Sequence, residues 1–231
     1  MISKKINKKE LCLAFDGFSA SGKSLGAKLI AKKYGLKLLN SGLLYRYAAF
    51  LILKNNPSKK IPFIKKKFAN LNYQKLTLLN LHSEKISNYS SIIAKQKKIR
   101  LILKQYQKKF AKKFKKIAIE GRDISTKILN KNPRYDVAFF FKCNLNTAAH
   151  RRWRDLIRSN RQITLDEVKK SLKKRNELDV KRRFSPLIQS KDSIIIRTDI
   201  LNKKAMVVKM SKEIDKKLKL KYGRNFKAKQ K

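Results

Sequence analysis

The chain has 231 residues, enough for one sizeable domain with a buried core, and its 61 Lys and Arg against 15 Asp and Glu give a formal net charge of +46. No apolar run approaches the length of a membrane span, and the basic N-terminal segment leads only to a short apolar run, Leu11–Phe15, unlike a secretory signal. We therefore expect a cytoplasmic protein without a membrane partner.

The high positive charge has two interpretations. A basic surface can bind nucleic acid, or lysine can simply be the default surface residue, as in chains encoded by A/T-rich codons. The basic residues are spread over the whole length, and no RNA-binding motif with interleaved aromatic residues is present. This spread favours the compositional interpretation, so we do not expect a nucleic acid partner, although the charge would still attract anionic nucleotides.

Apolar runs of strand length alternate with segments of helical spacing. Strands are expected at Leu11–Phe15, Leu36–Leu39, Ile117–Ile119, Val137–Phe141 and Ile194–Ile196. Helices are expected from Leu25 to Lys33 with Leu25, Leu29 and Ile30 buried, at Leu43–Leu53 with Ser41 as N-cap, and at Ser90–Phe114, Thr147–Ser159, Thr164–Arg182 and Asn202–Leu220. Thr164 and Glu167 form a candidate capping box. The alternation predicts an α/β fold with a central five-stranded parallel sheet.

The segment from about 56 to 90 breaks the alternation and is interpreted as part of an inserted lobe rather than a separate domain. It contains Gln74–Leu81, a candidate short strand, and it precedes the helix expected at Ser90–Phe114. The two cysteines, Cys12 and Cys143, fall in runs expected to be buried strands. Their spacing does not suit a metal site, and reduced buried thiols fit a cytosolic protein.

Residues Gly17 to Ser24 read Gly-Phe-Ser-Ala-Ser-Gly-Lys-Ser, the G-x-x-x-x-G-K-[ST] pattern of a phosphate loop. The expected strand before it and helix after it disfavour the alternative of an ordinary turn between core elements. Backbone N–H groups at the helix start can converge on phosphate oxygens, with Lys23 reaching the β- and γ-phosphates and the Ser24 hydroxyl taking a place on Mg²⁺. The candidate ATP-binding residues of this loop are Gly17, Phe18, Ser19, Ala20, Ser21, Gly22, Lys23, Ser24 and Leu25.

Three further clusters lie near the ends of predicted elements. The second strand is followed by Ser-Gly-x-x-Tyr-Arg at 41–46, the third by Glu-Gly-Arg-Asp at 120–123, and a late helix ends in Arg-x-x-x-Asp-x-x-Arg-x-x-Ser-Pro-Leu at 175–187. Because the carboxyl ends of parallel strands meet at one edge of a sheet, Ser41, Arg46, Arg122 and Asp123 are expected to face the same space as Lys23. Arginines there suit a transfer between two phosphate groups, because a guanidinium grips phosphate with two hydrogen bonds.

Together these motifs, from about Leu11 to Ile200, resemble the cytidylate kinase family of P-loop nucleoside monophosphate kinases. The resemblance implies three layers with an NMP-binding insert at about 56–114, a helical lid at about 147–165 and a monomer. It also implies transfer of the γ-phosphoryl group of ATP to CMP or dCMP with Mg²⁺. The implied acceptor-binding residues are Ser41, Arg46, Ser91, Arg100, Arg122, Asp123, Asp179 and Arg182.

By the same resemblance, Ser91, Arg100 and Asp123 read the cytosine and Asp179 holds the ribose. Ser90 or a nearby lysine is the alternative to Ser91 and Arg100. Arg46, Arg122 and Arg182 hold the acceptor phosphate, and Arg175 bridges the phosphates of both nucleotides. The implied catalytic residues are Lys23, Arg122, Arg175 and Arg182, and the lid candidates for ATP are Arg151, Arg154 and Arg158. Glu120 either holds a water on Mg²⁺ or pairs with a nearby arginine.

The chain departs from the family pattern at Phe18, Ala20 and Leu25 in the phosphate loop, at Asn40 where the family has Asp, and in a shorter insert. The shorter insert bears on selectivity for the base rather than on phosphoryl transfer, and Ser24 still fills the position that the phosphate-loop motif requires for Mg²⁺. Two alternatives remain: a P-loop kinase for UMP or another small acceptor, and an RNA-associated protein that binds a nucleoside triphosphate.

Overall fold

The structure is a computed structural model that describes residues 10–158 and 161–223. The chain falls into two compact units: the residues up to Leu38 together with those from Lys115 onward, and the segment Leu39–Phe114. The second unit therefore begins before the expected insert. The division into a core, an insert at about 56–114 and a lid stays a prediction.

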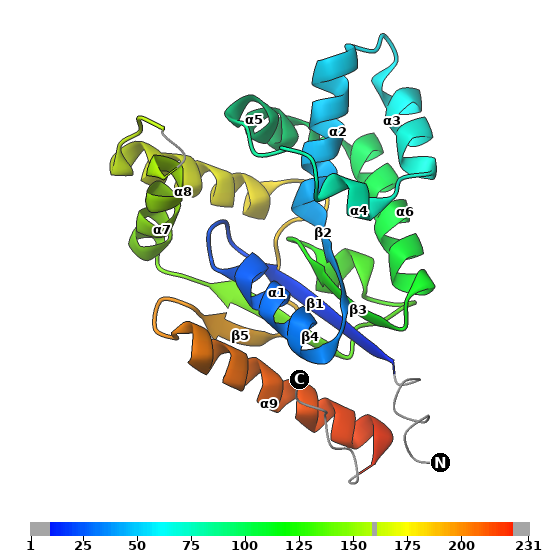
Figure 1. The fold of residues 1–231 in the computed structure, drawn as a ribbon, viewed down its shortest axis with the longest axis vertical. Coiled ribbons are helices and arrows are strands. Elements are labelled where there is room, and N and C mark those ends of the chain that lie inside the picture. The colour runs from blue at the N-terminus through cyan, green and yellow to red at the C-terminus, as the bar shows by residue number, and fades with distance from the viewer. Residues whose placement is uncertain (1–9, 159–160, 224–231) are drawn as a thin grey trace. The chain divides into compact units, whose positions relative to one another are not determined.

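The first unit is built on the predicted parallel sheet. Its order is β2-β3-β1-β4-β5, with β1 at Leu11–Gly17, β2 at Lys37–Asn40, β3 at Lys116–Glu120, β4 at Val137–Lys142 and β5 at Ile194–Arg197 (Figure 1). β1 pairs in parallel with β3 on one side and with β4 on the other, and β4 pairs in parallel with β5. All five strands were predicted, so the fold class is confirmed. Cys12 and Cys143 are half-buried rather than buried, and Cys143 follows β4.

Helices α1 (Lys23–Tyr34) and α9 (Lys203–Tyr222) lie side by side over one face of the sheet (Figure 1). Their apolar residues share a core with β1 and β4, and Gly26 lets α1 approach closely, since a Cβ there would lie 2.7 Å from the Phe141 ring. The prediction that Leu25 is buried is wrong: it is 39% exposed, because the helix begins at Lys23 and turns Gly26, Ala27 and Ile30 inward.

Helices α7 (Leu145–Ile157) and α8 (Leu165–Lys181) pack against each other through a small apolar cluster that includes Ala149, Leu156 and Leu172. The predicted capping box at the start of α8 is confirmed. α7 begins at Leu145 and not at the expected Thr147, because Asn144 caps it. A π-helical turn, η2 (Ile124–Ile128), follows the Gly-Arg-Asp segment. The predicted helix end at Ser159 and the basic tail beyond Gly223 lie outside the described residues.

The second unit is helical. It contains α2 (Ser41–Asn55), α3 (Lys60–Ala69), α4 (Tyr73–Leu76), α5 (Glu84–Ile93) and α6 (Lys97–Lys113). The single helix predicted over Ser90–Phe114 is wrong, since the chain turns between α5 and α6, and the strand predicted at Gln74–Leu81 is instead α4 and a turn. Asn40, not Ser41, caps α2 by accepting the N–H of Leu43 at 3.3 Å. Within the described ranges, no helix is long and apolar enough to cross a bilayer.

Candidate active site

The phosphate loop joins β1 to α1 as predicted, and its backbone explains its glycines. Gly17 has φ +149°, and a Cβ there would lie 2.4 Å from the carbonyl oxygen of Phe141. Gly22, at φ +76°, precedes the first residue of α1. Ala20 adopts φ +55°, a left-handed conformation that disfavours a residue with a Cβ. Phe18 packs edge-on against Phe140 with ring centroids 5.9 Å apart, so this departure from the family loop is accommodated by an aromatic contact.

Lys23 and Ser24 share one carboxylate. Oε2 of Glu120, at the end of β3, accepts from Nζ of Lys23 at 3.3 Å and from Oγ of Ser24 at 2.7 Å. Burial and the nearby Arg122 guanidinium lower the pKa of Lys23 to about 8, and Glu120 opposes that shift. Of the two alternatives for Glu120, pairing with a nearby arginine is thus wrong, because the basic partner of Glu120 is Lys23. The Ser24 hydroxyl and the Glu120 carboxylate lie close together, and oxygen atoms of these two kinds are the ligands that Mg²⁺ prefers.

The predicted arginines and aspartates of the first unit form one network. Asp179 accepts from Nε of Arg122 at 2.9 Å and from Nη1 of Arg182 at 2.9 Å. Arg182 also lies 4.0 Å from the Asp123 carboxylate and donates to the Ser185 carbonyl. Burial would raise the pKa of Asp179, but Arg122, Arg182 and Arg175 outweigh it, so the pKa is lowered. Five predicted residues are therefore brought together, two from the segment that follows β3 and three from α8 and its C-cap: Arg122, Asp123, Arg175, Asp179 and Arg182.

This network reaches the phosphate loop directly. Nη2 of Arg122 donates to the Ser19 hydroxyl at 2.9 Å, and the Ser19 N–H donates to Oδ1 of Asn176 at 3.0 Å. Helix α8 thus holds the loop from one side through Asn176, while Arg122 ties the loop to the Gly-Arg-Asp segment. Asn176 was not predicted, although it lies within the late motif between Arg175 and Asp179.

Asp16 is a second residue that the sequence analysis missed. It is 1% exposed at the end of β1 and accepts from the N–H groups of Ile124 and Ser125, each at 2.8 Å, and from the Ser125 hydroxyl at 2.7 Å. Burial raises its pKa, against these hydrogen bonds. Asp16 therefore fixes the segment directly after Asp123. An acidic residue closing an apolar run just before a phosphate loop is the signal that could have found it.

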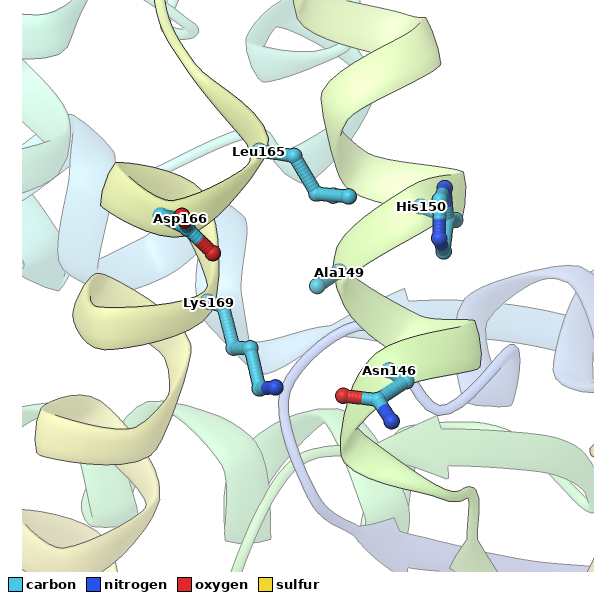
Figure 2. A pocket seen from close by; sticks show the side chains of 6 residues that line it. All are labelled: Asn146, Ala149, His150, Leu165, Asp166 and Lys169. Carbon is cyan, nitrogen blue, oxygen red and sulfur yellow. The ribbon is translucent and has the colours of Figure 1, made fainter.

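The lid candidates differ in their surroundings. Arg151 is half-buried and donates to the hydroxyl and the carbonyl oxygen of Thr198, at 3.0 and 2.6 Å, whereas Arg154 and Arg158 are exposed. A role for these arginines with ATP stays a prediction. A hollow of about 260 Å³ lies between α7 and α8, and none of the predicted site residues lines it. Figure 2 shows its lining side chains, which come from these two helices. Its lining residues are Asn146, Ala149, His150, Leu165, Asp166 and Lys169.

In the second unit, Arg46 donates to the Leu81 carbonyl at 3.1 Å and to the Ser87 hydroxyl at 2.7 Å. Arg100 donates to the Ala94 carbonyl and stacks over Tyr45. These two arginines are thus held in place by α2 and α5 and the loops beside α5.

The two serines of this unit have partners of their own. The Ser41 hydroxyl accepts from Nε2 of Gln107 at 2.6 Å, and both residues are buried. Ser91 donates back to Ser87 within α5. Gln107 was not predicted, and no local pattern in the sequence signals its contact with Ser41. The binding roles of Ser41, Arg46, Ser91 and Arg100 stay predictions.

Comparisons with known proteins show the family of the chain. A family model for cytidylate kinase matches residues 13–216. The chain belongs to the cytidylate kinase family. Curated relatives named cytidylate kinase include one from Bartonella tribocorum, 32% identical over 84% of this chain and 89% of the relative, and one from Mesomycoplasma hyopneumoniae, 31% identical over 91% and 96%. The family resemblance expected from the sequence is therefore confirmed.

A solved structure of an uncharacterized protein from Eubacterium ventriosum agrees with the fold. It has a TM-score of 0.55 and 21% identity and covers 90% of this chain and 99% of that chain. At this identity the likeness concerns the fold alone, and membership of the cytidylate kinase family rests on the family model and the curated relatives.

Proposed function

We propose that the chain transfers the γ-phosphoryl group of ATP to CMP or dCMP in the cytoplasm. Membership of the cytidylate kinase family over residues 13–216 carries the proposal. The network of Arg122, Asp179 and Arg182 beside the phosphate loop supports it, because a transfer between two phosphates needs several positioned cations.

The donor half of the reaction would use the phosphate loop. Its backbone N–H groups and Lys23 would hold the β- and γ-phosphates, and Ser24, with Glu120 beside it, would hold Mg²⁺ directly or through a water. When bound, Mg²⁺ would neutralise charge on the β- and γ-phosphate oxygens. A pKa of about 8 keeps Lys23 mostly protonated at neutral pH, as binding of phosphate requires.

The acceptor half would use the guanidinium groups. Arg122, Arg182 and Arg46 would hold the acceptor phosphate, Arg175 would bridge the two nucleotides, and Asp179 would hold the ribose. Ser41, Ser91, Arg100 and Asp123 would bind the rest of the acceptor. The acceptor phosphate monoester is largely a dianion at neutral pH, so no strong base is required, and positioning and charge neutralisation supply the catalysis.

The test is release of ADP by the purified chain with ATP, Mg²⁺ and each of CMP, dCMP, UMP and AMP. We expect CMP or dCMP to be the best acceptor by at least about tenfold in kcat/KM, which corresponds to 1.4 kcal/mol of discrimination. Lys23→Ala should remove the CMP-dependent activity. Efficient use of UMP or AMP without CMP, or full activity of Lys23→Ala, would contradict the proposal. Hydrolysis of ATP that depends on RNA would instead favour the RNA-associated alternative.

A further inference from the structure

Thr198 follows β5 directly and is 4% exposed, although neither the phosphate loop nor the arginine motifs include it. Its hydroxyl donates to the carbonyl oxygen of Ser21 in the phosphate loop at 2.9 Å and accepts from Nη1 of Arg151 on α7 at 3.0 Å. A threonine hydroxyl has one proton and two lone pairs. Because the guanidinium can only donate, it leaves the hydroxyl proton for Ser21, and the direction of both hydrogen bonds is fixed.

The carbonyl that Thr198 holds belongs to the peptide between Ser21 and Gly22. In a trans peptide the C=O and the N–H point in opposite directions, so holding the Ser21 oxygen turns the N–H of Gly22 away from Thr198. Gly22 also faces this side chain closely, since a Cβ built on it would lie 3.4 Å from Cγ2 of Thr198. Gly22 precedes α1, where N–H groups of a phosphate loop bind phosphate oxygens.

Arg151 completes the arrangement. Its Nη2 donates to the Thr198 carbonyl at 2.6 Å, and its Nη1 also lies 3.6 Å from the Cys143 sulfur. Two hydrogen bonds from one guanidinium to one residue are a rigid attachment. α7 is therefore linked through Thr198 to the phosphate loop, across the end of β5.

We propose that Thr198 is a positioning residue for ATP: its hydroxyl orients the Ser21–Gly22 peptide so that the phosphate loop presents its N–H groups to the nucleotide, and Arg151 orients that hydroxyl. The inference rests on the proposed function, in which this loop binds ATP. Its value to the reaction is preorganisation, because N–H groups that are already oriented need no rearrangement when the phosphates arrive.

The test compares three variants of the full chain. Thr198→Val keeps the shape of the side chain and removes both hydroxyl hydrogen bonds, and Thr198→Ser restores the hydroxyl. Thr126→Val is the matched control, because the buried Thr126 hydroxyl has no hydrogen-bond partner among residues 10–158 and 161–223. Binding of Mg²⁺ with the non-hydrolysable analogue AMP-PNP is measured by calorimetry, and the KM values for ATP and CMP are measured separately.

We expect Thr198→Val to raise the dissociation constant of AMP-PNP and the KM for ATP by about five- to thirtyfold, the effect of one or two lost hydrogen bonds. The KM for CMP should change by less than about twofold, Thr198→Ser should recover most of the affinity, and Thr126→Val should match the native chain. Unchanged AMP-PNP binding in Thr198→Val would overturn the inference. So would equal losses for ATP and CMP, no recovery in Thr198→Ser, or a native chain that does not bind AMP-PNP. A native chain that binds AMP-PNP through Thr198 but does not phosphorylate CMP would refute only the proposed function.

Discussion

The charge of Lys23 depends on one neighbour, and Glu120→Gln tests this. Burial and Arg122 lower the pKa of Lys23 to about 8, while the Glu120 carboxylate, 3.3 Å from Nζ, raises it. Two unit charges at that separation interact by about 5 kcal/mol at an effective dielectric constant of about 20. Because a polar glutamine replaces part of this interaction, we expect the pKa to fall by about one to three units rather than by the full amount.

The assay is the pH dependence of kcat/KM for ATP at saturating CMP, which reports groups of the enzyme before ATP binds. Lys23 binds phosphate only when protonated, so native activity should decline as the pH rises through about 8. In Glu120→Gln the same decline should appear about one to three pH units lower. A lower maximal rate is also expected because a neutral glutamine beside Ser24 is a weaker ligand for Mg²⁺ than a carboxylate, but this does not move the midpoint.

Lys23→Arg provides the control, since a guanidinium keeps its charge over the whole pH range and should show no such decline near pH 8. The reasoning is refuted if the midpoint in Glu120→Gln stays where it is in the native chain or moves to higher pH. It is also refuted if Lys23→Arg retains the native midpoint, because the titrating group would then be another one.

Three further predictions concern single side chains. Asp179→Asn should lower the free energy of unfolding by about 3 kcal/mol in urea, because two guanidinium groups lose their carboxylate. Because the pKa of Asp179 is lowered by folding, the stability difference between the native chain and Asp179→Asn should persist above pH 3.8. It should vanish as the pH falls further and the carboxylate of the native chain becomes protonated. Ala20→Gly should raise the free energy of unfolding by up to about 1 kcal/mol, because glycine adopts φ +55° without the strain that a Cβ causes. A clear decrease in the free energy of unfolding would contradict this account of strain at Ala20. Gln107→Leu should raise the KM for CMP about fivefold by removing the donor to Ser41, with the KM for ATP unchanged and Gln105→Leu, on the exposed side of α6, as the control.

The sheet could be predicted from the sequence because its strands are buried on both faces. Val137–Phe141 and Leu11–Phe15 are continuous apolar runs, and such runs between turn signals are typical of parallel strands. The helices of the second unit were less predictable. Ile92 fits the periodicity of one long helix, yet it is 54% exposed, because α5 ends at Ile93 and the chain turns before α6. Hydrophobic periodicity along the sequence does not reveal a helix break when the apolar residues before and after the break continue the same spacing.

The site was predictable where residues belong to a motif and not where they act through tertiary contacts. Arg122 lies 57 residues before Asp179 in the chain, whereas Arg182 is only three residues beyond it, and the family resemblance placed all three at one site. Thr198 was missed because the rule that strand ends converge was applied to the second and third strands and not to β5. Gln107 contacts Ser41 across 66 positions, a contact that no local pattern encodes.

The acidic residues explain how so basic a chain can build an ordered site. Only 15 of the 231 residues are acidic, yet Glu120 holds Lys23 and Asp179 holds two guanidinium groups. Cations gathered at one place repel each other, and a carboxylate between them both offsets that repulsion and fixes where each donor points. The net charge of +46 acts at long range and attracts any anion, whereas these few carboxylates decide which basic groups are ordered around the phosphate loop. Adding lysines to the surface should therefore change the rate of nucleotide association, while removing a carboxylate should change the selectivity of the site.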